Sequence, residues 1–145
     1  MRALIQRVAH SRVTVEGQCI AEIGAGLVIL LGVSLSDGKS QADYLVEKIV
    51  NLRIFEDQSG KINRSLLDVG GSAIVVSQFT LYADTRKGRR PSFTDAAAPE
   101  IARPLIDYFA RLMVEKGVHT QTGQFGAHMV VEIANDGPLT IWLER

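Results

Sequence analysis

The chain has 145 residues, of which 46% are hydrophobic, and this length and composition fit one domain, 1–145, with a well-filled core. Its 16 basic and 16 acidic residues cancel, so the net charge does not indicate a polyanionic partner, and any contact with nucleic acid must come from a local patch. The single cysteine, Cys19, excludes an internal disulfide and a zinc site with several cysteines, which favours a reducing compartment.

The sequence contains no segment that predicts export or membrane insertion. The first residues lack the uninterrupted apolar region of a signal peptide, and the longest apolar run, Leu27–Val33, is too short to span a bilayer. We therefore expect a soluble, cytoplasmic protein without a membrane partner.

The first third of the chain predicts a hairpin, a central strand and a helix. Residues 2–15 alternate and are rich in β-branched side chains, 16–18 indicate a turn, and 19–23 resume the alternation. The run 27–33 is apolar on both faces, which is typical of a strand that is covered on both sides. Apolar residues then recur at helical spacing, with polar residues opposite them. The inward positions of this helix are Ala42, Leu45, Val46, Ile49 and Val50.

The middle of the chain predicts two strands, a loop and a second helix. Residues 52–55 indicate a short strand, Gly70 and Gly71 introduce a stronger one over 72–81, and the polar, basic segment 82–97 indicates a loop. A helix is expected from near Pro99 to Lys116, closed by a glycine. Its inward side chains are Ile101, Leu105, Ile106, Phe109, Leu112 and Met113.

Pro104 complicates the start of this second helix. Either it lies in the first turn, where a missing N–H costs little, or it kinks the helix. Residues 118–123, 127–134 and 139–143 predict three further strands. The order of these elements predicts an α+β domain with two helices.

Several features resemble catalytic sites but do not meet their requirements. The glycine before Gly38-Lys39-Ser40 is Gly32, which leaves five intervening residues where a phosphate-binding loop needs four. The three histidines have no arrangement of Ser, Cys or Asp around them that indicates a catalytic triad, and His128 lies on the more polar face of its expected strand. No His, Asp and Glu spacing indicates a metal site, so neither a metal nor another cofactor is predicted.

The basic run Arg86-Lys87-Gly88-Arg89-Arg90 is the only local concentration of charge. It fits a solvated loop or a contact with a phosphate backbone, and both interpretations remain open.

Two short segments have unusual composition. Ser77–Tyr82 mixes polar and aromatic residues at the end of an apolar strand, where a core strand would alternate. Asn135–Thr140 contains Gly137-Pro138, and an X-Pro bond adopts the cis form far more readily than other peptide bonds. Such a pair can present two stiff carbonyl groups, although a tight turn explains these six residues equally well.

Together these segments resemble the signature motifs of the D-aminoacyl-tRNA deacylase family, Ser-Gln-Phe-Thr-Leu-Tyr and Asn-x-Gly-Pro. The resemblance extends over nearly the whole chain, and it implies mixed, mostly antiparallel sheets that form a barrel-like core with two packed helices. It includes 6–8, 26–33, 51–57, 60–63, 88–93 and 122–129.

The resemblance implies a cytoplasmic homodimer that hydrolyses the ester between a D-amino acid, or glycine, and the 3′ end of a tRNA. By resemblance, the aminoacyl pocket is lined by Ser77, Gln78, Phe79 and Thr80, while Phe125 and Met129 hold the terminal adenosine. Gly137-Pro138 would enter the pocket from the other subunit, and Arg7 would steady this pair.

The chemistry of the residues fits this expectation. Immovable main-chain carbonyls can reject an L side chain and accept glycine, because a side chain pressed against them desolvates oxygens without pairing them. The 2′-hydroxyl of the ribose can assist hydrolysis, with main-chain N–H groups near Phe79 and Thr80 stabilising the oxyanion. The alternatives are Thr80 as a nucleophile, a non-catalytic tRNA-binding module, or a nucleotide enzyme that uses the loop at Lys39.

Overall fold

The computed structural model describes all 145 residues. The elements, in chain order, are β1 (Arg2–Val15), β2 (Gln18–Ile23), β3 (Gly26–Gly32), α1 (Lys39–Asn51), β4 (Phe55–Glu56), β5 (Ile62–Arg64), α2 (Leu66–Val69), β6 (Ser72–Ser77), the 3₁₀ helix η1 (Phe79–Tyr82), α3 (Pro99–Glu115), β7 (Thr120–Thr122) and β8 (Val130–Glu144). None of the helices is both long enough and apolar enough to cross a membrane.

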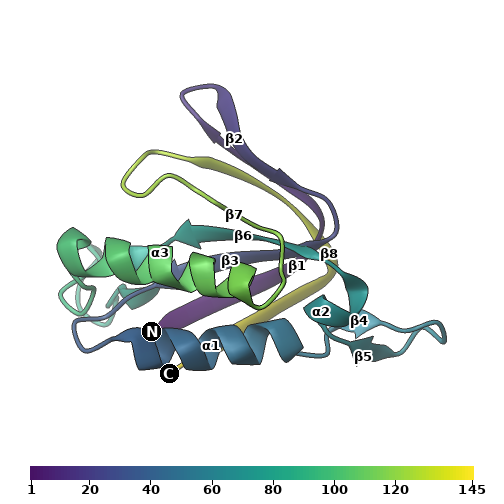
Figure 1. Ribbon diagram of the computed structural model, residues 1–145. Coiled ribbons are helices and arrows are strands. Elements are labelled where there is room, and N and C mark those ends of the chain that lie inside the picture. The colour runs from purple at the N-terminus through teal and green to yellow at the C-terminus, as the bar shows by residue number, and fades with distance from the viewer.

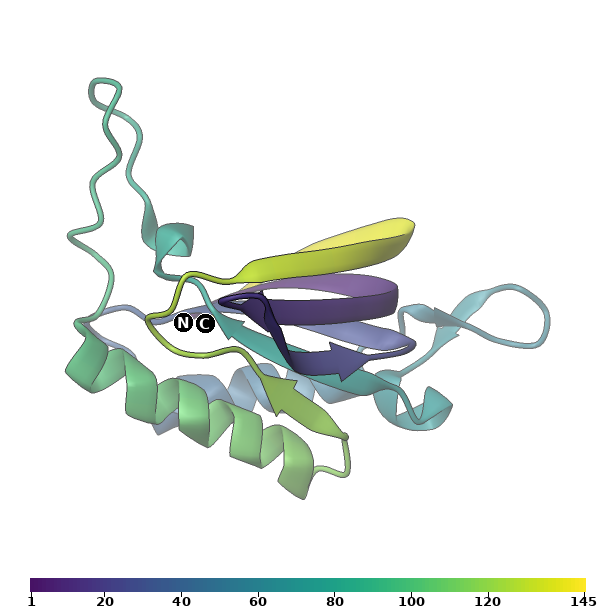
Figure 2. The ribbon, with the colours of Figure 1, turned by 90° about the horizontal axis from the view of Figure 1, so that it is seen from above.

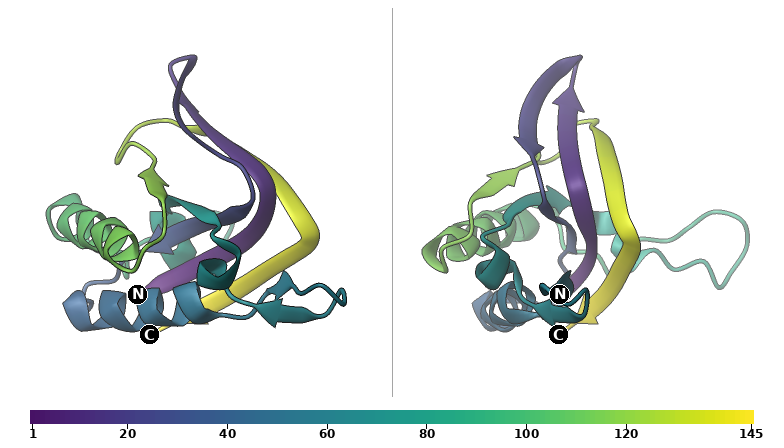
Figure 3. Two further views of the ribbon diagram at one scale, coloured as in Figure 1. Left: turned by 45° about the vertical axis from the view of Figure 1, so that its right-hand side comes forward. Right: turned by 90° about the vertical axis from the view of Figure 1, so that its right-hand side faces the viewer.

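A mixed sheet of six strands is built around β1. The order is β2-β1-β3-β6-β7, and β8 also pairs with β1. The first half of β1 lies between β3 and β8, and its second half lies between β2 and β8, all antiparallel. β3, β6 and β7 run parallel to one another. The long strands bend, so the sheet is nearly closed into a barrel, as Figure 1 and Figure 3 show. The predicted α+β fold with a barrel-like core is confirmed.

The two long helices, α1 and α3, lie on one face of the sheet and bury the larger core, a cluster of 23 residues (Figure 1). All five predicted inward positions of α1 are buried there. A second cluster of seven residues lies on the other face, under the curled part of β1 and β2. β3 contributes to both clusters, which confirms that it is a strand covered on both sides.

The strand expected over 72–81 is shorter than predicted. β6 ends at Ser77 because the main-chain N–H of Gln78 makes the last bond of this ladder, to the carbonyl of Leu31 at 2.8 Å, and β3 ends at the next residue. Residues 79–82 then turn into η1. A strand cannot extend beyond the partner that satisfies its backbone groups.

The region around residue 60 contains a small sheet and a short helix that the sequence analysis did not predict. The expected strand 52–55 is reduced to β4, which pairs with β5. A helix of four residues, α2, follows, so the fold has three α-helices where two were expected. Its signal was present in the sequence: Ser65 and Asp68 form a capping box, and Gly70 ends the helix in the left-handed conformation.

The second of the two predicted helices corresponds to α3, which starts at Pro99 as predicted and continues through Pro104. Pro104 lies beyond the first turn on the exposed side, where water can satisfy the carbonyl that its missing N–H leaves free. The prediction that Ile101 faces inward is wrong, since its side chain is 44% exposed.

The two strands expected over 127–134 and 139–143 form one strand, β8, which begins at Val130. Asn135 pairs with Val8 and Thr140 pairs with Gln6, so both parts of β8 lie against the same strand. The four residues between them bulge opposite Arg7, and Figure 3 shows β8 bent sharply near its middle. The segment is therefore a large bulge within one strand and not a turn that reverses the chain.

Candidate active site

A mostly apolar cavity of about 390 Å³ lies between η1 and the first half of α3. Its walls come from the end of β6, η1, the segment before α3, α3 itself and the loop after β7. The lining residues are Leu31, Val33, Ser77, Gln78, Phe79, Phe93, Ala96, Ala97, Pro99, Ala102, Ile106, Phe125 and Gly126. No side chain of this wall carries a charge, so the cavity suits a flat or apolar group.

Three predicted site residues, Ser77, Gln78 and Phe79, reach the cavity because β6 ends beside Gly32. A Cβ atom at residue 32 would lie 3.0 Å from the carbonyl oxygen of Gln78, so a glycine permits the close approach of the two chains. Phe79 packs edge to face against Phe93, with ring centroids 4.9 Å apart. Both rings line the cavity.

The base of η1 is anchored by Arg2 and Tyr82. The guanidinium of Arg2 lies 4.3 Å from the centroid of the Tyr82 ring, donates to the carbonyl of Leu81 at 2.9 Å and pairs with Glu144 at 2.8 Å. Tyr82 is buried, and this burial raises the pKa of its hydroxyl to about 12. η1 is therefore held from below by packing, a hydrogen bond and an ion pair.

Thr80 lies beside the cavity and does not line it. Its hydroxyl oxygen accepts a hydrogen bond from the side-chain amide of Gln78, and no histidine or carboxylate bonds to it. The first N–H groups of a helix have no acceptor within that helix, and in η1 they belong to Phe79 and Thr80. This turn can therefore offer main-chain donors, whereas it holds no general base.

The histidines and the lysine loop, which were other candidate sites in the sequence, do not line the cavity. His10, His119 and His128 are all exposed, and His128 precedes β8. Lys39 lies over the ring of Tyr108, 5.2 Å from its centroid. No group of three or more His, Cys, Asp or Glu side chains could hold a metal ion.

Phe125 and Met129, the two residues predicted to hold adenosine, lie in different environments. Phe125 lines the cavity, and the guanidinium of Arg103 lies 5.0 Å from its ring centroid. Met129 packs against the smaller core beside Gly123, where a Cβ atom would meet the methionine sulfur at 2.7 Å.

Arg7, Gly137 and Pro138 form a separate cluster at the bulge of β8. The buried guanidinium of Arg7 donates to the carbonyl of Ile54 at 2.7 Å. Its Nε lies 2.9 Å from Oδ2 of Asp136, in an orientation that makes the contact ionic and not a hydrogen bond. Gly137 and Pro138 are exposed, their peptide bond is cis, and Gly137 has a φ of 114°, a conformation that favours glycine.

Asn135 supports this bulge, a role that the sequence analysis did not identify. Its side-chain amide donates to the carbonyl of Arg7 at 2.9 Å and to that of Leu139 at 3.0 Å. Its oxygen accepts from Thr140 at 3.2 Å and from Gln6 at 3.3 Å. An asparagine at the foot of a segment that leaves the sheet was the available signal, since this residue often bonds to nearby backbone.

The cavity and the bulge lie far apart within one chain. The cavity adjoins the end of the sheet where Arg2 pairs with Gly32 and Glu144, whereas the bulge lies opposite Arg7. Arg7 lies five positions beyond Arg2 on β1, which corresponds to roughly 16 Å. Gly137 and Pro138 therefore do not reach the cavity of their own chain.

Solved structures share this fold over the whole chain. One described as c-Myc DNA Unwinding Element Binding Protein has a TM-score of 0.95 and 42% identity, covering 100% of this chain and 99% of that one. Another, titled as a probable eukaryotic D-amino acid tRNA deacylase, has a TM-score of 0.84 over 98% of this chain and 97% of that one. Its identity is 17%, so this second match shows the fold alone.

Sequence relatives identify the family. Proteins named D-aminoacyl-tRNA deacylase from Thermomicrobium roseum and Roseiflexus castenholzii are 59% and 60% identical, over 99% of this chain and 94% and 92% of theirs. The family described as D-Tyr-tRNA(Tyr) deacylase matches residues 4–144. The fold and the relatives define an enzyme of the hydrolase class. The chain belongs to the D-Tyr-tRNA(Tyr) deacylase family, which confirms the resemblance drawn from the two motifs.

Proposed function

We propose that the protein hydrolyses the ester that links a D-amino acid, or glycine, to the 3′ end of a tRNA, and that it works as a homodimer without a metal or cofactor. The observation that carries this proposal is the uncharged cavity beside η1, where aromatic side chains and main-chain groups meet with no acid or base among the lining residues. An aminoacyl ester is already activated, so orientation and charge stabilisation can suffice for its hydrolysis.

The shape of the cavity supports a terminal adenosine and its aminoacyl group as occupants. Its volume lies within the range of about 300–1,000 Å³ that small-molecule sites usually have. The rings of Phe79, Phe93 and Phe125 offer surfaces on which a base can stack. Ser77 and Gln78 add polar groups beside them. Met129 would act through its packing beside the loop at Gly123.

Selection against L-amino acids would come from Gly137 and Pro138 of the second copy. These residues protrude from the sheet, they are held by Arg7 and Asn135, and they lie too far from the cavity of their own chain. Main-chain oxygens have no rotamers by which to yield, so an L side chain pressed against them would be rejected. Glycine, which has no side chain, would be accepted.

The chemical step would use the 2′-hydroxyl of the terminal ribose, with the N–H groups of Phe79 and Thr80 facing the developing oxyanion. The alternative is nucleophilic attack by Thr80, whose hydroxyl has only the amide of Gln78 as a partner. An unassisted hydroxyl is a weak nucleophile. Turnover of a Thr80→Val variant separates the two routes: near-normal rates support the RNA-assisted route, and a loss of several powers of ten supports attack by Thr80.

The function is tested by incubating the purified protein with D-tyrosyl-tRNA and L-tyrosyl-tRNA, without ATP or added metal. Release of D-tyrosine, with L-tyrosyl-tRNA left intact, is the expected result. A non-catalytic tRNA-binding module would bind both and release neither amino acid, and this outcome would contradict the proposal. A substrate that ends in 2′-deoxyadenosine should react slowly only if the ribose takes part.

A further inference from the structure

The segment between η1 and α3 forms an arm, defined here as residues 84–92, that projects from the body of the molecule (Figure 2 and Figure 3). Two main-chain hydrogen bonds close its neck: Asp84 N–H donates to the carbonyl of Ser92 at 2.7 Å, and Ser92 N–H donates to that of Asp84 at 2.9 Å. Gly88 has a φ of 69° and permits the tight turn at the tip. The arm is therefore a closed loop with a defined neck.

The arm concentrates positive charge in a chain whose net charge is zero. Residues 84–92 contain four basic side chains and one acidic one, Asp84. Such an excess costs free energy through mutual repulsion unless an anion meets it. Within the chain, one of the four basic side chains is paired with a carboxylate and the other three are not.

Arg86 is compensated. Its Nε and Nη2 donate to the two carboxylate oxygens of Asp84 at 2.9 and 2.7 Å, and its main-chain N–H donates to the same carboxylate at 3.0 Å. These bonds lower the pKa of Asp84 to about 2, so the pair stays ionised at physiological pH. Arg86 therefore offers no free charge to a ligand.

The other three cations are free. Lys87, Arg89 and Arg90 are exposed, and none of them has an ion pair or a side-chain hydrogen bond with another residue. All three lie between the two neck residues, Asp84 and Ser92, and are open to solvent.

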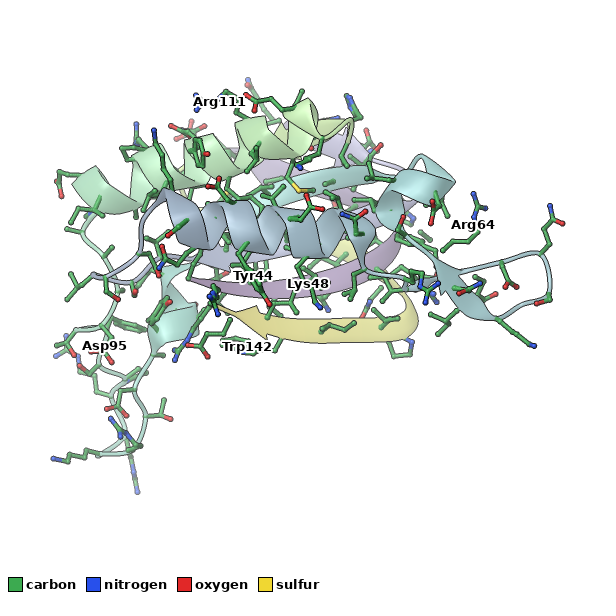
Figure 4. All side chains as sticks on the ribbon, turned by 60° about the horizontal axis from the view of Figure 1, so that its bottom comes forward. Tyr44, Lys48, Arg64, Asp95, Arg111 and Trp142 are labelled. Carbon is green, nitrogen blue, oxygen red and sulfur yellow. The ribbon has the colours of Figure 1, made fainter.

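The arm rises directly from the wall of the cavity. Phe93, the first residue after the neck, lines the cavity and packs against Phe79, and Ala96 and Ala97 line it as well. Figure 4 shows the arm leading away from the sheet, with Asp95 at its base. A polymer whose end occupies the cavity can therefore pass along the arm.

We propose that Lys87, Arg89 and Arg90 bind phosphates of the RNA strand whose 3′ end occupies the cavity. This inference rests on the proposed function, which supplies the polyanion. Phosphate contacts of this kind are independent of sequence and position the ligand without selecting it.

The test is the salt dependence of binding to a tRNA transcript that carries no amino acid, measured between about 50 and 200 mM salt. The variant Lys87→Gln/Arg89→Gln/Arg90→Gln removes the three free charges. The matched control Asp84→Asn/Arg86→Gln alters the same arm without changing its net charge. Thermal unfolding of both variants verifies that the fold is intact.

Three phosphate contacts should shrink the slope of log K against log salt by about 2 to 3 in the triple variant, and lower affinity on the order of a hundredfold near 0.1 M salt. The control should keep the wild-type slope. An unchanged slope in the triple variant, or an equal change in the control, overturns the proposal. The binding assay uses tRNA that carries no amino acid, so it is independent of catalysis. Failure of the wild-type protein to release D-tyrosine from D-tyrosyl-tRNA would therefore overturn the proposed function separately.

Discussion

At the scale of single residues, Asn135 shows how one side chain positions a main-chain segment that no regular ladder supports. Its amide spans the bulge by donating to one carbonyl on each side, those of Arg7 and Leu139. Its oxygen is fixed by Gln6 and Thr140. Four hydrogen bonds at the bulge therefore involve this one side chain.

Aspartate has nearly the same shape as asparagine, so an Asn135→Asp variant should loosen the bulge without a change in side-chain size. A carboxylate cannot donate, so both carbonyls would lose their partner and face a negative charge, at a cost of about 1–3 kcal/mol. We expect the ratio of D- to L-tyrosyl-tRNA hydrolysis to fall, as measured by competitive deacylation. Thr140→Val, which removes the hydroxyl bonds to Asn135 and Gln6 but leaves both Asn135 bonds to the main chain, serves as the control. An unchanged ratio in Asn135→Asp would exclude a positioning role.

At the scale of elements, the parallel pair β3 and β6 depends on a close approach at Gly26. A Cβ atom at this residue would lie 1.9 Å from the carbonyl oxygen of Ser72, whereas at Gly24 it would meet nothing within 4 Å. Backbone atoms cannot move aside as a flexible side chain can. The start of β6, and with it the path of the chain to η1, therefore requires glycine at residue 26.

Gly26→Ala should lower the free energy of unfolding by about 3 kcal/mol or more, because the strands must separate to admit the methyl group. Gly24→Ala, two residues away, should change it by less than about 0.5 kcal/mol. Urea denaturation of both variants measures the difference. Similar values for the two would show that the strands adjust easily.

The base of η1 gives a pH-dependent prediction. The folded state raises the pKa of Tyr82 from 10.0 to about 12, so its contribution to stability is complete below pH 10 and is lost as the pH rises towards 12. The Tyr82→Phe variant should therefore lose less stability than the wild type in this window. In the absorbance titration of the three tyrosines, the component that this variant lacks should have its midpoint near 12. A midpoint near 10 would contradict the buried environment of this hydroxyl.

At the scale of the whole molecule, the separation of cavity and bulge predicts that selectivity is supplied by the partner copy. A variant with a filled cavity, Ala96→Trp, should be inactive but retain an intact bulge. A variant without the pair, Gly137→Ala/Pro138→Ala, should hydrolyse both D- and L-tyrosyl-tRNA. Mixed dimers then combine the intact cavity of one with the intact bulge of the other.

Adding an excess of the inactive variant under conditions of subunit exchange should suppress L-hydrolysis by the unselective variant and preserve its D-hydrolysis. With statistical exchange, nearly all active cavities would then face an intact bulge. The activities are measured on both substrates as the excess increases. Persistence of L-hydrolysis, with exchange verified independently, would mean that the pair acts within its own chain or not at all.

The sequence by itself determined the elements whose pattern is local: the hairpin of β1 and β2, the doubly buried β3, and the buried face of α1. It also contained the two motifs that identify the family. Alternation and helical spacing suffice there, because each residue's environment follows from the period of its own element. The basic run was visible as well, although its free and paired members could not be told apart.

Only the tertiary structure decided where β6 ends, that β8 is one strand, and that the site residues divide between a cavity and a distant bulge. Each of these depends on pairing between segments far apart in the chain, such as Gln78 with Leu31 and both parts of β8 with β1. Local periodicity carries no information about which backbone groups a partner strand will satisfy, and that satisfaction sets the limits of the strands and the position of the site.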